Sequence, residues 1–117
     1  MKKIILLVDD ENIIRLTSGE ILEELGFDVI IACTGSEGLE IFNKRYGEIS
    51  LVILDMTLPD ISGIEVFQKM KKISSNMKFL LTSGYKREMT DAVNEVSFIQ
   101  KPYTIEELSN SIDALIG

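Results

Sequence analysis

Acidic residues directly follow two of the apolar runs in this chain. Asp9 and Asp10 follow the run 4–8, and Asp55 follows the run 51–54. Short unbroken stretches of Val, Ile and Leu are typical of strands buried in a parallel sheet, and such sheets bind ligands beyond the carboxyl ends of their strands. If the two runs are neighbouring strands, each pair of carboxylates ~4 Å apart repels by roughly 4 kcal/mol at an effective dielectric constant of 20. The carboxylates therefore need a proton, a lysine or a divalent cation among them, which predicts a metal-dependent carboxylate site.

Two further polar residues stand at the ends of later apolar runs. Lys101 follows the fifth run and Ser83 follows the fourth. Carboxylate oxygens suit Mg²⁺, which uses few protein ligands and often binds substrate phosphate as well. A carboxylate can also attack phosphorus and form an aspartyl phosphate, and a lysine and a hydroxyl could then contact the phosphoryl oxygens. Each residue alone has an ordinary explanation as a surface or turn residue, so the prediction depends on their shared placement at four strand ends.

Strands and helices must alternate to place these residues together. We expect strands over 4–8, 29–32, 51–54, 78–82 and 96–100. An apolar stripe that includes Ile13 and Leu16 predicts a helix over 12–25, ended by Gly26. Capping boxes at Thr34, Ser62 and Thr104 predict three more helix starts. The last of these helices is expected to bury Ile105, Leu108, Ile112 and Leu115.

This alternation with short connections predicts a parallel sheet covered on both faces by helices. We expect five strands and five helices in one domain, residues 1–117. The weakest element is the polar segment 86–95, for which we expect a short, mobile helix.

Composition excludes several classes of function. The net charge is −7 without a basic cluster, so we expect no direct binding to nucleic acid or to anionic lipid. The chain has no histidine, so it cannot donate phosphate from an imidazole. Cys33 is the only cysteine, fits a reducing cytoplasm and is expected to pack as a small apolar residue. No apolar run approaches the roughly 18 residues that a membrane span requires.

Four segments resemble the receiver domains of two-component response regulators, the CheY-like family. They are LLVDDE at 6–11, LVILDMTLPDISGIE at 51–65, LLTSGY at 80–85 and FIQKPYTIEEL at 98–108. The resemblance covers the whole chain, in order and with familiar spacing. It implies a flavodoxin-like (βα)5 three-layer α/β sandwich with the parallel strand order 2-1-3-4-5, the order that chemotaxis receivers of this family have.

The resemblance also implies roles at the predicted site. Asp55 would be the phosphoacceptor. Asp9 and Asp10 would hold Mg²⁺ together with Asp55 and the backbone carbonyl of Met56. Lys101 would contact the phosphoryl group, and its bond to the following proline would be cis.

Further roles by resemblance concern signalling. Ser83 and Phe98 would be the switch residues, while Thr57 and Tyr85 would tune hydrolysis of the aspartyl phosphate. A histidine kinase or phosphotransfer protein would supply the phosphoryl group, and an output domain or protein would read the switch. The stretch from Ser83 to Lys101 is about one helical turn shorter than is usual in the family, so we expect a monomer or a weak dimer.

Three other interpretations stay open. A flavin-binding protein of the same fold class would need a phosphate-cradling first loop, whereas this loop is Asp-Asp-Glu. A phosphatase with an aspartyl nucleophile would want a second acid at the position of Thr57. The chain could also be a receiver fold that acts only as an unphosphorylated interaction module, against which the complete set of acids argues.

Overall fold

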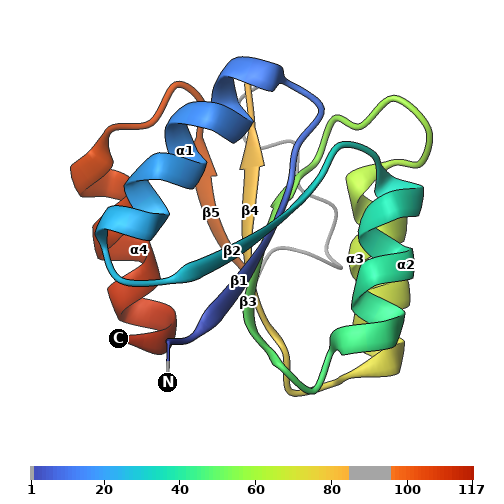
Figure 1. The fold of residues 1–117 in the computed structure, drawn as a ribbon. Coiled ribbons are helices and arrows are strands. Elements are labelled where there is room, and N and C mark those ends of the chain that lie inside the picture. The colour runs from blue at the N-terminus through green and yellow to red at the C-terminus, as the bar shows by residue number, and fades with distance from the viewer. Residues whose placement is uncertain (1, 85–95) are drawn as a thin grey trace.

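A five-stranded parallel sheet forms the centre of the molecule (Figure 1). The computed structural model describes residues 2–84 and 96–117. The strands are β1 (Ile4–Val8), β2 (Asp28–Ala32), β3 (Ile49–Asp55), β4 (Lys78–Ser83) and β5 (Ser97–Gln100). Their order across the sheet is β2-β1-β3-β4-β5, which confirms the predicted order.

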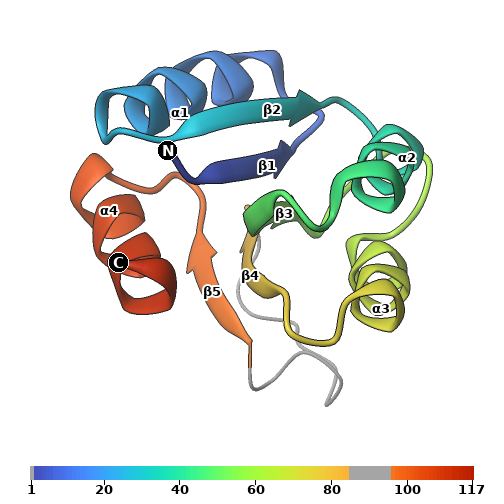
Figure 2. The same cartoon turned by 60° about the horizontal axis from the view of Figure 1, so that its bottom comes forward.

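Helices cover both faces of the sheet. The described residues form α1 (Asn12–Glu24), α2 (Gly35–Arg45), α3 (Gly63–Ile73) and α4 (Ile105–Ile116). Helices α1 and α4 lie on one face, and α2 and α3 on the other (Figures 1 and 2). Two buried apolar clusters fill the layers between sheet and helices, so the three-layer sandwich is confirmed. The short helix predicted within 86–95 lies outside the described residues.

The buried face of α1 differs from the predicted apolar stripe. Its buried residues are Ser18, Gly19 and Leu22, whereas Ile13 is 66% exposed and Leu16 57% exposed. Ile13 stands nine residues before Leu22, about two and a half turns of helix, and therefore lies on the opposite side. A Cβ at Gly19 would lie 3.6 Å from Ile31 Cδ1, an ordinary van der Waals distance, so this face of α1 lies close to β2.

Two other burial predictions are wrong. Ile105, expected in the buried stripe of the last helix, is 60% exposed at the first position of α4. Cys33, expected to pack as a small apolar residue, is exposed just after β2. Both residues lie where the chain enters a helix. At such positions the path of the connecting loop sets the exposure of a side chain, even when that side chain is apolar.

The helices begin and end close to the predicted residues, but only one of the predicted capping boxes forms in full. Gly26 ends α1 with a positive φ of 98°, a conformation that glycine adopts without strain. Thr34 and Ser62 accept hydrogen bonds from the backbone N–H groups three residues on, but of the three predicted capping boxes only Thr104 is reciprocated, by Glu107. Within the described ranges, no helix has the length and apolar character needed to cross a membrane.

Candidate functional site

The strand register brings the predicted acids to one edge of the sheet. Val8 lies opposite Leu54, so Asp9, just after β1, and Asp55, the last residue of β3, lie at the same edge of the sheet. On the other side of β3, Asp55 lies opposite Thr82 of β4. β5 lies beside β4, and Lys101 follows it immediately. Parallel pairing therefore brings residues almost a hundred positions apart to a single site.

Lys101 is the centre of this cluster. Its Nζ lies 2.8 Å from Asp9 Oδ2, 3.0 Å from Glu11 Oε1 and 3.1 Å from Asp55 Oδ2. Asp9 is 1% exposed, Asp55 2% and Lys101 8%. An ammonium has three N–H donors, so each of these carboxylates can accept one of them. This arrangement offsets part of the cost of burying like charges next to one another.

The surroundings of Asp55 raise its pKa above the ordinary value. Burial raises the pKa of Asp55 to about 6, and the charge of Asp9 adds to this, while the Thr57 N–H and Lys101 act against it. The Thr57 N–H donates to Asp55 Oδ1 at 2.9 Å. Burial alone would lower the pKa of Lys101, but hydrogen bonds to Asp9 and Glu11 and the charge of Asp55 hold it above its ordinary value.

Hydrogen bonds hold the loop after β1 in place. The Glu11 N–H donates to Asp9 Oδ1 at 2.9 Å, and the Asp9 N–H donates to the carbonyl of Ala32 at 3.1 Å. Arg15 Nη1 donates to the Asp9 carbonyl at 2.9 Å. The Glu11 N–H therefore orients the Asp9 side chain, and Arg15 from the first turn of α1 holds the Asp9 backbone.

The loop after β3 is fixed by close packing. The Met56 N–H donates to the Thr82 carbonyl at 2.8 Å, and the Met56 carbonyl accepts from the Gly63 N–H at 3.2 Å. A Cβ at Gly63 would lie 2.4 Å from the Met56 Cα. Only glycine fits at this position, because any side chain would push the start of α3 away from the end of β3.

The site has the donor set of a hard cation. Carboxylate oxygens of Asp9, Asp10, Glu11 and Asp55 all lie within 4.8 Å of one another. An all-oxygen set of this kind fits Mg²⁺. A cavity of about 500 Å³ opens beside it, lined by Asp10, Glu11, Asp55, Thr57, Gly84 and Lys101. Glu11 was missed as a site residue, although the run Asp-Asp-Glu after the first strand was a signal that could have found it.

The remaining predicted residues surround this cavity in different ways. Ser83 is buried at the end of β4, where its carbonyl accepts from the Lys101 N–H at 2.8 Å. Phe98 is partly buried and packs against the core cluster under α2 and α3. Thr57 is exposed at the cavity wall, and Tyr85 lies outside the described residues. The Lys101–Pro102 bond is cis, as the resemblance implied.

Tyr103 was not predicted as part of the site. Its hydroxyl lies 2.7 Å from the hydroxyl of Ser18, which is 2% exposed. This hydrogen bond joins the middle of α1 to the segment between β5 and α4. Burial raises the pKa of Tyr103, opposed by the hydrogen bond with Ser18, and the charges of Asp9 and Lys101 reach it as well.

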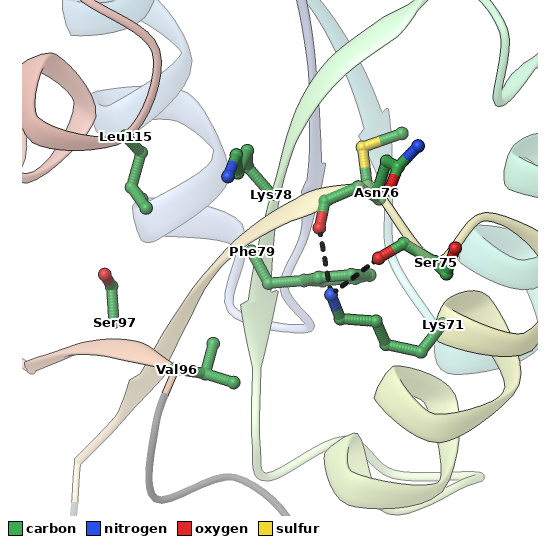
Figure 3. Close-up of a pocket in the computed structure, with 9 residues that line it drawn as sticks. Lys71, Ser75, Asn76, Lys78, Phe79, Val96, Ser97 and Leu115 are labelled. Carbon is green, nitrogen blue, oxygen red and sulfur yellow. Dashed lines mark hydrogen bonds between the residues drawn. The ribbon is translucent and has the colours of Figure 1, made fainter.

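A second cavity of about 500 Å³ lies at the opposite edge of the sheet, where β4 and β5 begin (Figure 3). Lys71 lies over the ring of Phe79 there, 5.6 Å from its centroid, and donates to the carbonyls of Ser75 and Met77. No acid is among the residues that line this second cavity. The carboxylate donors that fit a hard cation therefore line the first cavity and not this one.

Comparison with known proteins agrees with this geometry. The family described as response regulator receiver domain matches residues 5–113. The crystal structure of the response regulator TrrA from Thermotoga maritima, in complex with Mg²⁺ and BeF, superposes with a TM-score of 0.88. That protein is 34% identical, over 97% of this chain and 99% of the other.

Curated relatives differ greatly in length. Sporulation initiation phosphotransferase F from Bacillus subtilis is 28% identical, over 96% of this chain and 92% of its own. The sensor kinase CckA from Brucella abortus is also 28% identical, but this chain spans only 12% of it. The chain spans about half of several transcriptional regulators that it matches. The matched residues, the strand order and these similarities together show that this chain belongs to the response regulator receiver domain family.

Proposed function

We propose that the chain, over residues 1–117, is a receiver domain in which Asp55 accepts a phosphoryl group. The observation that carries this proposal is the position of Asp55, which ends the central strand β3 with Lys101 Nζ 3.1 Å from one carboxylate oxygen and a cavity in front of it. With a pKa of about 6, Asp55 is mostly ionised near neutral pH and can act as a nucleophile.

The transfer would be a displacement at phosphorus. An Asp55 oxygen forms the new P–O bond, while the bond from phosphorus to a donor histidine breaks and its electron pair leaves with the imidazole. Lys101 would stabilise the negative charge of the phosphoryl oxygens. Asp9, Asp10 and Asp55 would hold Mg²⁺, which supplies further positive charge to those oxygens when it is bound.

The backbone ligand of the metal has two candidates. The Met56 carbonyl, implied by the resemblance, already accepts the Gly63 N–H, so it would have to use its second lone pair. Thr57 lines the cavity beside Asp55. We therefore favour the carbonyl of Thr57 as the backbone ligand.

Switching would follow from the new charge on Asp55. Ser83, buried at the end of the adjacent strand β4, would move its hydroxyl towards the phosphoryl group, and Phe98 would turn into the space released. Thr57 and Tyr85 would tune how fast water removes the phosphoryl group. The outcome would be a shift between two states of this part of the surface rather than a new fold.

Partners would bind next to the cavity. Ile13, Leu16 and Ile105 are large apolar side chains exposed near the starts of α1 and α4, the helices that follow the acidic loop and the Lys101 loop. We propose that a histidine kinase or phosphotransfer protein docks there and that an output domain or protein reads the switch.

Phosphorylation can be tested without the natural partner. Incubation with acetyl phosphate and Mg²⁺, followed by intact-mass measurement, should add one phosphoryl group to the wild-type chain and none to Asp55→Asn. The variant Asp113→Asn, which alters an exposed acid on α4, should be labelled like the wild type. A phosphoryl adduct that persists in Asp55→Asn would disprove the assignment.

A further inference from the structure

Glu11 contacts Lys101 but differs from the other acids around it. Its side chain is 53% exposed, against 2% for Asp9 and Asp55. Glu11 immediately precedes α1 and lines the cavity in front of Asp55. Three carboxylates contact the Lys101 ammonium, and Glu11 is the one that has no role in the proposed function.

Glu11 also changes the charge of the site. Four carboxylates and one ammonium carry three formal negative charges. A bound Mg²⁺ would leave one negative charge, and a phosphoryl group on Asp55 would add to it. By Coulomb's law the Glu11 charge therefore attracts the cation and repels the phosphoryl group.

Glu11 also competes for the ammonium. Asp9 and Asp55 are proposed ligands of the cation and would turn from Lys101 towards it. Glu11, whose Oε1 lies 3.0 Å from Lys101 Nζ, is not among these proposed ligands and would keep its contact with the ammonium. A phosphoryl group would then share Lys101 with a full negative charge that does not leave. The two effects have the same direction, since both weaken binding of a phosphoryl group.

We propose that Glu11 is a positioning residue that sets the balance of the site, strengthening the binding of Mg²⁺ and weakening that of the phosphoryl group through its hold on Lys101. This inference rests on the proposed function of the site. It predicts that removal of the Glu11 charge shifts the two affinities in opposite directions, which a merely structural role would not do.

Two titrations of the full chain test this. The first measures the Kd of Mg²⁺ by calorimetry, and the second measures the Kd of BeF₃⁻, a phosphoryl mimic, by NMR at saturating Mg²⁺. For Glu11→Gln, which keeps the size and a hydrogen-bond acceptor, we expect Mg²⁺ to bind about threefold to fivefold more weakly and BeF₃⁻ about threefold to fivefold more tightly, as for a half-exposed ion pair.

A matched variant separates charge at the site from charge elsewhere. Glu20→Gln makes the same change at an exposed position of α1 and should leave both affinities within about twofold of the wild type.

The outcomes are distinct. Opposite shifts confined to Glu11→Gln support the inference. Shifts of the same sign, no shift, or an equal effect of Glu20→Gln overturn it while the proposed function stands. A wild-type chain that binds neither Mg²⁺ nor BeF₃⁻ would overturn the proposed function and this inference with it.

Discussion

The buried charge of Asp55 should cost the fold stability that an uncharged residue would restore. Asp55 has a pKa of about 6 in the fold against 3.8 for the free side chain. Since one pKa unit corresponds to about 1.4 kcal/mol, ionised Asp55 lowers the free energy of unfolding by about 3 kcal/mol. The variant Asp55→Asn resembles the protonated side chain, so it should be more stable than the wild type by about this amount above neutral pH.

The sign of the pH dependence is specific. Below the unfolded pKa the carboxyl is protonated in both states and contributes nothing, so the wild type loses stability as the pH rises from about 4 to about 6 and then levels off. Asp55→Asn lacks this loss, and its advantage should therefore vanish near pH 4. The gain in stability of Asp55→Asn would arise because the variant removes a buried charge that the proposed function needs but that destabilises the fold.

Urea unfolding in EDTA at about pH 4 and about pH 8 measures this difference directly. Asp28→Asn, an exposed acid at the start of β2, is the control and should follow the wild type at both pH values. Equal stability of Asp55→Asn and the wild type near pH 8, or a difference that does not change with pH, would refute the electrostatic reasoning.

Three further predictions concern the metal, the core and a helix end. Mg²⁺ at about a hundred times its Kd should raise the free energy of unfolding by about 2.7 kcal/mol, and Asp9→Asn should abolish this gain in the same urea titration. Leu22→Ala should cost about 2–5 kcal/mol because the side chain is fully buried, whereas Leu16→Ala should change stability by less than about 0.5 kcal/mol; similar losses would show that Leu16 is buried after all. A hydrogen bond from the Ser36 side chain holds the pKa of Asp60 below its usual range, and the first two N–H groups of α2, which donate to the same carboxylate, act in the same direction. The ionised form of Asp60 therefore stabilises the fold, so Asp60→Asn should lower the urea midpoint near neutral pH. This difference should shrink progressively as the pH falls below about 4, towards the lower pKa of the folded state, and a difference that did not shrink would contradict this.

The strands and the predicted site residues at their ends could be inferred from sequence because they depend on local patterns. An apolar run that ends in an acid is visible without any tertiary information, and β1 and β3 are such runs. The strand order came from resemblance to a family, since alternation of strands and helices is compatible with several orders. The buried face of a helix was harder to predict. The 3.6-residue repeat that includes Ile13 and Leu16 indicates a helix, but it does not show which side of that helix packs against the sheet.

The class of fold and the kind of chemistry could be read from the amino acids alone, because strand length, apolarity and the residue that follows each strand are local properties. Which carboxylates contact Lys101 became known only from the folded chain, which added Glu11 to the residues that sequence reasoning had found. The folded chain likewise shows that α1 buries Ser18 and Gly19 and leaves Ile13 exposed. Contacts between side chains distant in the sequence depend on strand register and helix rotation, which no single segment of the chain encodes.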